Sequence, residues 1–164
     1  MKTRFKIFGL VAATLFAVSC TEEDNTIDQV FDGVSSGAVL RGVQIISNEL
    51  PIGDETASFS IELEEQDNQD GALLESMDVF VKFTDNSEDE GDSTGGITEE
   101  VFLMNVPASE FSDGEFGLPR YTLTITASDF LAAANLTVDQ IFGGDTFTTR
   151  LAVNLTDGRT FSVD

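Results

Sequence analysis

The side chains that most often carry out covalent chemistry in proteins are scarce in this sequence. Cys20 is the single cysteine, and the chain has no histidine and no tryptophan. A Ser-His-Asp triad, a Cys-His pair and an imidazole-ligated metal therefore cannot form within this sequence. A lone cysteine also excludes an internal disulfide, an iron–sulfur cluster and a thiolate zinc site. The thiol of Cys20 is thus the main candidate for covalent chemistry.

Carboxylates are the abundant ionisable groups: 30 Asp and Glu residues stand against 8 Lys and Arg residues, and the formal net charge is −22. Two carboxylic acids can hydrolyse a glycoside, but no spacing singles out one pair, so we expect surface charge and no enzymatic activity.

The stretch from Asp85 to Asp92 could offer oxygen ligands to calcium. An EF-hand loop that began at Asp85 would need a glycine where Glu90 stands and a glutamate where Gly96 stands. We therefore expect a solvated loop, with no metal and no cofactor. Such an acidic body makes nucleic acid an unfavourable partner.

The N-terminal segment has the organisation of a secretory signal peptide. Met1 to Lys6 contain several basic residues, and an uncharged apolar run follows from Ile7 to Val18. This run is shorter than the roughly 20 residues that a membrane-spanning helix needs. The small residues at its end fit a cleavage site after Ser19. We therefore assign residues 1–19 to a signal peptide.

Ala17-Val18-Ser19-Cys20 resembles the lipobox of bacterial lipoproteins, in which the cysteine thiol receives a diacylglyceryl group and the cysteine becomes the new N-terminus. Ala17 departs from the Leu that is commonest at its position. The alternative is an ordinary signal-peptidase site, which would leave Cys20 as a free thiol; both alternatives cut the chain between Ser19 and Cys20. The position of the single cysteine at this junction favours lipidation, and several fatty acyl chains such as palmitate would anchor the protein stably to a membrane.

The residues that follow Cys20 predict an acidic tether. Thr21 to Asn25 form an acidic cluster, and the polar composition continues to Gly37. In lipoproteins of Bacteroidota, which this junction resembles, such stretches act as an export signal to the outer face of the outer membrane. The resemblance implies a lipid-anchored protein that faces the cell exterior. We assign residues 20–37 to a flexible linker.

From Ala38 onward the apolar residues recur with a period of two, which predicts β-strands. The alternation is clearest from Ala57 to Glu64, where every second residue is apolar and the others, including Glu64, should form a wet outer face. Asp157-Gly158 predicts a two-residue hairpin turn with positive φ at both residues. Further strands are predicted at 39–46, 77–83, 101–106, 121–126 and 147–155.

One stretch interrupts the β pattern. Ser128 is a good N-cap for a helix that continues to Ala134, and Thr137 to Gln140 have the spacing of a capping box. We expect one or two short helices that cross an end of the fold. About seven strands with one short helical crossover predict an immunoglobulin-like antiparallel β-sandwich over residues 38–164.

The region of this crossover contains Ile125 to Phe130, Leu136, Gly143-Gly144-Asp145 and Arg150 to Val153. These residues resemble the N-terminal sandwich domain of Bacteroidota lipoproteins that accompany starch-utilisation-type uptake systems. The resemblance covers about the last quarter of the chain and implies fold and setting rather than chemistry. It implies a non-enzymatic accessory or binding component of a TonB-dependent nutrient (glycan) uptake system, in contact with a TonB-dependent transporter and its lipoprotein partner. The alternative is a structural or adhesive envelope lipoprotein that mediates protein–protein contacts.

Two further positions are candidate surface sites. Phe80 shares a strand face with Asp78 and Lys82, so we expect it to be exposed or part of a partner interface; a singly exposed apolar residue, which is normal on any surface, is the alternative. Asp92-Ser93-Thr94 resembles the short motif at which Bacteroidota attach O-glycans to exported proteins, which implies a glycan on Ser93.

Overall fold

The computed structural model describes residues 36–87 and 99–162 of the chain. In these residues one α-helix, α3 (Ala127–Ala134), and two 3-10 helices, η1 (Ala108–Glu110) and η2 (Val138–Gln140), accompany the strands. The strands are β1 (Val39–Ser47), β2 (Ser58–Gln66), β3 (Leu74–Thr84), β4 (Val101–Pro107), β5 (Ser112–Asp113), β6 (Pro119–Thr126), β7 (Thr146–Leu155) and β8 (Thr160–Ser162).

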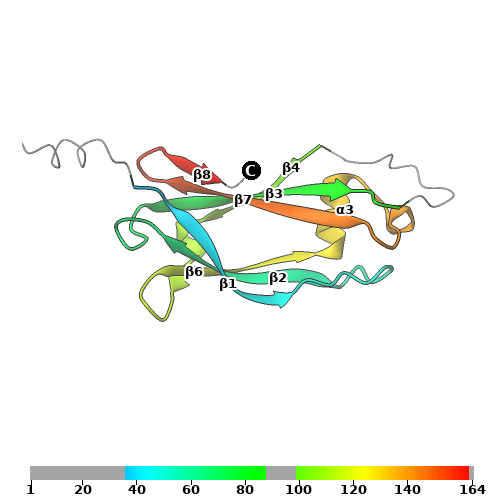
Figure 1. Cartoon of the computed structure of the whole chain (residues 1–164), viewed down its shortest axis with the longest axis horizontal. Coiled ribbons are helices and arrows are strands. Elements are labelled where there is room, and N and C mark those ends of the chain that lie inside the picture. Colours follow the sequence, from blue (N-terminus) through cyan, green and yellow to red (C-terminus); the bar gives the residue numbers. More distant parts are fainter. Residues whose placement is uncertain (1–35, 88–98, 163–164) are drawn as a thin grey trace, which may run out of the picture. The chain divides into compact units, whose positions relative to one another are not determined.

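The strands form two antiparallel sheets that lie as the two layers of a sandwich (Figure 1). One sheet has the order β1-β2-β6-β5 and the other the order β4-β3-β7-β8. With the strands lettered A, B, C, C′, D, E, F and G along the chain, the sheets are ABED and C′CFG, which is the strand order of immunoglobulin-like sandwiches. The predicted all-β sandwich with a short helical crossover is confirmed.

The core lies between the facing sides of the two sheets. The residues of β3 alternate between buried and half-buried along most of its length, because every second side chain points toward the other sheet. The side chains of Met77, Val79 and Val81 on β3 are fully buried, and they meet Leu123 and Ile125 from β6. Each such side chain contributes roughly 1.5–3 kcal/mol through burial, so the period-two pattern decides which face of each strand turns inward.

The crossover between β6 and β7 is helical, as predicted, but the helix begins earlier. Its N-cap is Thr126 and not Ser128: the Thr126 Oγ1 accepts a hydrogen bond from the Asp129 N–H at 3.1 Å, and the Asp129 carboxylate accepts one from the Thr126 N–H at 3.0 Å. This reciprocal capping box satisfies two backbone donors at once. The helix then places Phe130 against Phe147, with the ring centroids 4.9 Å apart, and so closes one end of the core.

The prediction for the Asp157-Gly158 turn is wrong in its detail. Gly158 has a positive φ of 84°, whereas Asp157 does not have a positive φ. The Leu155 N–H donates to the Arg159 carbonyl at 2.9 Å, so three residues lie between the closing pair. A three-residue loop of this kind needs a left-handed residue only at its last position, which glycine fills.

The Asp-Gly pair with positive φ at both residues lies instead between β2 and β3. Asp70 has a φ of 55° and Gly71 a φ of 86°. The carboxylate of Asp67 accepts hydrogen bonds from three backbone N–H groups of this loop, including that of Gly71 at 3.0 Å. Because Gly71 lies directly against the ring of Pro119, a Cβ atom there would approach the Pro119 Cδ to 2.1 Å. The loop therefore closes tightly onto the start of β6.

The outer face of β2 is not wet at its end, contrary to the sequence-based expectation. Glu64 is fully buried there. It lies opposite Arg41 of β1 on one side and opposite Arg120 of β6 on the other, and it forms an ion pair with each, at 2.7 Å from the Arg120 Nε. The hydrogen bond from Arg120, helped by Arg41, holds the pKa of Glu64 below its ordinary value even though burial opposes this.

The next side chain, Glu65, points to the interior because successive residues of a strand face opposite sides. It has no exposed surface, and neither carboxyl oxygen has a hydrogen-bond partner. Burial raises the pKa of Glu65 to about 7, and the neighbouring Asp67 carboxylate acts in the same direction. A buried charge without a partner is costly, so the folded protein favours the protonated form of this group.

We expect Glu65→Gln to stabilise the protein above neutral pH. The folded-state pKa is about 7 against an ordinary value of 4.5, so the native state holds a proton that the unfolded state releases between these pH values. The wild type thus loses about 3 kcal/mol of stability as the pH rises through this range, and a neutral glutamine does not. Urea unfolding at about pH 4, pH 6 and pH 8 measures this difference.

The matched control is Glu64→Gln, the neighbouring residue with the opposite pKa shift. This variant should be less stable than the wild type at about pH 8, and the difference should shrink as the pH falls because the Glu64 contribution is lost on protonation. A Glu65→Gln variant that is less stable than the wild type at about pH 8 would contradict the burial argument.

Gly71→Ala should destabilise the protein more than Gly53→Ala. Both glycines have nearly the same left-handed φ, 86° and 85°, so the backbone strain of an alanine is matched. Only Gly71 lies against another residue, whereas nothing lies within 4 Å of a Cβ atom at Gly53. Overpacking should therefore add about 1–3 kcal/mol at Gly71. Thermal unfolding measures the loss of stability in each of the two variants. Equal losses would show that the contact with Pro119 does not constrain the loop.

Candidate functional site

The outer face of the β4-β3-β7-β8 sheet carries the sequence-predicted candidate Phe80. Asp78, Phe80 and Lys82 share this face, as the alternation of β3 predicted. Phe80 lies in register with Phe102 of β4 and with Arg150 of β7. The sheet therefore brings residues from three strands together around one aromatic ring.

Phe80 is half-buried beneath its neighbours rather than fully exposed. The guanidinium carbon of Arg150 lies 4.1 Å from the centroid of the Phe80 ring, which is the geometry of a cation–π contact. The ring of Phe102 meets the edge of Phe80 with centroids 5.7 Å apart and an angle of 72° between the rings. Phe102 is 56% exposed, so it is Phe102 that presents the aromatic surface to solvent.

Glu100 holds Arg150 in place over the Phe80 ring. Its carboxylate accepts a hydrogen bond from the Arg150 Nε at 2.9 Å and another from Nη2 at 2.6 Å. Such a two-pronged contact fixes the plane of the guanidinium group. The hydrogen bonds from Arg150 lower the pKa of Glu100, and the nearby Lys82 acts in the same direction. We call Phe80, Phe102, Arg150 and Glu100 the aromatic cluster.

A network of polar side chains adjoins the aromatic cluster on the same sheet face. The Asp78 carboxylate accepts hydrogen bonds from the side-chain amides of Asn105, at 2.6 Å, and Asn154, at 2.9 Å. The Asn154 side chain also accepts a hydrogen bond from the Thr160 hydroxyl at 2.8 Å. These contacts join all four strands of the sheet from the outside. Amide, carboxylate and aromatic groups on one flat face are recognition chemistry, because they combine apolar contact area with directional hydrogen bonds.

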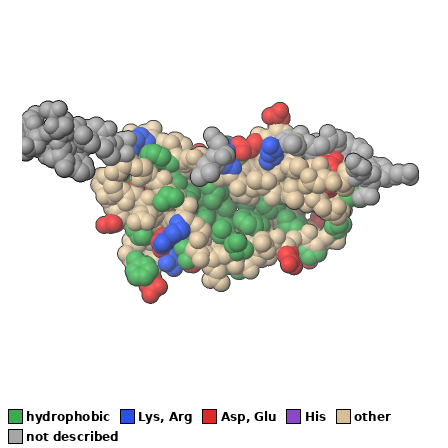
Figure 2. Space-filling view, in the orientation of Figure 1, with side chains coloured by type: hydrophobic (Ala, Val, Ile, Leu, Met, Phe, Trp, Pro, Cys, Tyr) green, Lys and Arg blue, Asp and Glu red, His purple; other side chains and the backbone are tan. Residues whose placement is uncertain are grey.

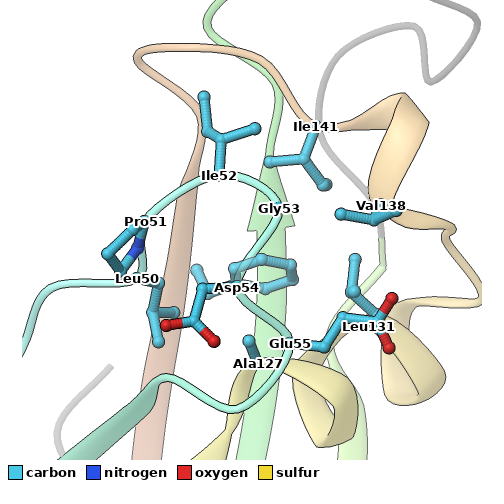
Figure 3. Close-up of a pocket in the computed structure, with 11 residues that line it drawn as sticks. Leu50, Pro51, Ile52, Gly53, Asp54, Glu55, Ala127, Leu131, Val138 and Ile141 are labelled. Atoms are coloured by element: carbon cyan, nitrogen blue, oxygen red, sulfur yellow. The ribbon is translucent and has the colours of Figure 1, made fainter.

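An apolar pocket lies at the helical end of the sandwich (Figure 3). The side chains of Ile52, Leu131, Val138 and Ile141 converge on it from the β1–β2 loop, α3, η2 and the residue after η2, and Phe147 lines it as well. Its volume is about 40 Å³, well below the roughly 300–1,000 Å³ of sites that enclose small molecules. This pocket is a packing feature of the crossover and not a site for a metabolite.

Other sequence-predicted sites lie outside the described residues. These are the cleavage and lipidation residues Ser19 and Cys20, the glycosylation candidate Ser93, and the part of the acidic stretch that follows Ser87. Within residues 36–87 and 99–162, no group of three or more Asp or Glu side chains is placed to hold a metal ion. Across the same residues no helix has both the length and the apolar character needed to cross a membrane.

Sequence reasoning identified Phe80 but missed Phe102 and the Arg150–Glu100 pair. The reason lies in the register between β3 and β4, which shifts after the pairing of Val79 with Met104 so that Phe80 pairs with Phe102. Leu103 is the extra residue of this bulge, and a bulge changes which side chains share a face. The strict alternation of a regular strand therefore could not have placed Phe102 beside Phe80.

Comparison of this chain with protein-family models, with curated proteins and with solved structures gave no match.

Proposed function

We propose that the protein is a non-enzymatic, lipid-anchored binding protein of the outer-membrane surface, which serves as an accessory component of a TonB-dependent nutrient (glycan) uptake system. The observation that carries the binding role is the exposed Phe102 within the aromatic cluster. A large exposed aromatic ring that is braced by a second ring and an immobilised arginine is the kind of group that dominates binding at protein interfaces. The acidic body keeps the protein soluble around this exposed apolar group.

The proposed membrane localisation rests on the sequence. The signal-like segment, Cys20 at its end and the acidic cluster that follows support a lipoprotein, and the crossover motif supports the uptake setting. An accessory of this kind would contact the transporter or its lipoprotein partner through the β4-β3-β7-β8 face. The alternative, a structural or adhesive envelope lipoprotein, would use the same face for other protein contacts.

We expect the mature protein to carry acyl chains on Cys20. The intact mass should exceed that of a chain that begins at Cys20 by the mass of the lipid, and Cys20→Ala should move the protein from the membrane fraction to the soluble fraction because several chains are needed for stable anchoring. A mature protein with a free Cys20 thiol would refute the anchor and leave the binding face untouched.

We expect Phe102→Ser to reduce the recovery of partner proteins about tenfold or more, as is typical of a residue that dominates an interface. The measurement is a tagged pull-down from detergent-solubilised outer membranes with quantitative mass spectrometry. Phe116→Ser is the matched control, because Phe116 is 74% exposed but lies in the β5–β6 turn. Thermal unfolding should show that both variants stay folded.

Recovery of a TonB-dependent transporter and its lipoprotein partner by the wild type, and its loss in Phe102→Ser alone, would support the uptake role. Recovery of envelope scaffolding proteins, or of the bait alone, would favour the structural alternative. Equal losses in Phe102→Ser and Phe116→Ser would show that the aromatic cluster is not the contact.

A further inference from the structure

Glu65 is a buried ionisable group that belongs neither to an ion pair of the fold nor to the aromatic cluster. Its side chain has no exposed surface, and in the part of the chain that the structure describes neither carboxyl oxygen has a hydrogen-bond partner. Figure 2 shows hydrophobic side chains gathered between the two layers, which is the interior toward which Glu65 points. Such surroundings tolerate a protonated carboxyl group far better than a carboxylate. The protonation state of Glu65 therefore matters to the residues that cover it.

The β2–β3 loop covers the Glu65 carboxyl group. A Cβ atom at Gly71 would lie 3.1 Å from the Glu65 Oε2 and 2.1 Å from the Pro119 Cδ, so the backbone of Gly71 rests directly on both residues. Within residues 68–72, Gly71 is buried and the other four residues are exposed. We call residues 68–72 the lid. The lid therefore touches the interior through one glycine and turns its other residues to water.

The two ends of the lid are fixed, whereas the lid itself is held by few contacts. Gln66 still pairs with β1 at one end, and the Leu73 carbonyl accepts a hydrogen bond from the Thr156 N–H at 2.8 Å at the other. Between these points the Asp67 carboxylate accepts hydrogen bonds from three backbone N–H groups. A segment that buries so little apolar surface is of the kind that opens locally while the rest of the domain stays folded.

The charges around Glu65 favour its proton. Burial raises the pKa of Glu65 to about 7, and the Asp67 carboxylate acts in the same direction. Loss of the proton would therefore place a second anion beside Asp67 in the interior. The other charged or titratable residues on the elements around Glu65 are paired with one another, exposed or neutral: Glu64 with Arg41 and Arg120, Asp157 with Arg159, Asp70, Glu75, Glu110 and Tyr121.

We propose that the lid is a pH-operated device, which closes over Glu65 while the carboxyl group is protonated and lifts from Pro119 when the proton is lost to solvent. Lifting admits water to the carboxylate and moves it away from apolar surroundings, so the open lid stabilises the ionised form. The device changes the surface at this end of the domain near neutral pH. This proposal is independent of the lipid anchor and of the partner that Phe102 contacts.

The direction of the pH response follows from the two states of the lid. With the lid closed the pKa of Glu65 is about 7, and with the lid open the group should have its ordinary pKa of 4.5. Below pH 4.5 both states hold the proton. Between the two pKa values only the open state releases it, so the ratio of open to closed lid should rise about tenfold per pH unit, and it should level off above pH 7. From pH 5 to pH 8 the ratio should rise roughly 70-fold.

Amide hydrogen exchange of the purified full chain, followed by NMR, measures this ratio. The reporters are the amides of Gln69 and Gly71, which donate to Asp67 at 2.6 and 3.0 Å when the lid is closed. Their protection factors, which correct for the intrinsic pH dependence of exchange, should fall roughly 70-fold from pH 5 to pH 8. In Glu65→Gln they should stay constant. Glu75→Gln, which removes an exposed carboxylate from β3, is the control and should keep the wild-type response.

Low concentrations of urea separate lid opening from unfolding of the whole domain. Opening of the lid exposes little surface, so exchange at Gln69 and Gly71 should hardly depend on urea well below the unfolding midpoint. Exchange in the β3–β7 ladder requires global unfolding and should accelerate with urea over the same range.

A second readout is the titration of the Glu65 carboxyl carbon by NMR. In Gly71→Ala the added Cβ would meet Pro119, which should keep the lid lifted and move the pKa of Glu65 from about 7 toward 4.5. In Gly53→Ala, where nothing lies within 4 Å of the added atom, the pKa of Glu65 should stay near 7.

The proposal is wrong if the protection of Gln69 and Gly71 does not change between pH 5 and pH 8, or if it falls equally in Glu65→Gln. It is also wrong if these two amides show the urea dependence of the β3–β7 ladder, because the opening would then be global unfolding. An unchanged Glu65 titration in a folded Gly71→Ala variant would show that the lid does not shield the carboxyl group.

Discussion

The buried carboxylate of Glu64 holds one sheet of this sandwich together from the outside. It lies between Arg41 and Arg120, so a single anion joins the edge strand β1 and the inner strand β6 to β2. Because Glu64 is fully buried, removing Arg41 or Arg120 would leave its charge less well compensated. β1 depends on this contact because several of its large apolar side chains, among them Ile45 and Ile46, face solvent rather than the core. The ion pairs compensate in part for the burial that this edge strand lacks.

The pleat of β2 then forces the adjacent Glu65 into the interior, where it has no partner. The two neighbouring carboxyl groups therefore respond to pH in opposite directions: Glu64 stabilises the fold when ionised, and Glu65 when protonated. The same end of the sandwich holds the tight β2–β3 loop, in which Asp67 binds three backbone N–H groups and Gly71 contacts Pro119. One end of the domain thus combines an unpaired acid with a constrained loop.

The opposite sheet places its polar and aromatic side chains outward, and this arrangement suits binding. Arg150 lies over the Phe80 ring in the aromatic cluster, and the Glu100 carboxylate holds it there. The cluster presents apolar contact area in a chain whose net charge is −22, where long-range repulsion disfavours non-specific association.

The amino-acid sequence by itself determined the fold class, because a period of two in apolar residues and a single helical interruption permit few architectures other than a sandwich. It also placed Asp78, Phe80 and Lys82 on one outward face. It could not reveal the burial of Glu64, since that depends on two arginines from strands far apart in the chain that the sheet register brings opposite it. Nor could it reveal the pairing of Phe80 with Phe102, which follows from a bulge in β4. The period of a strand is a local property that can be recognised in the sequence. Register and strand order arise from long-range pairing, so only the tertiary structure decided which side chains meet.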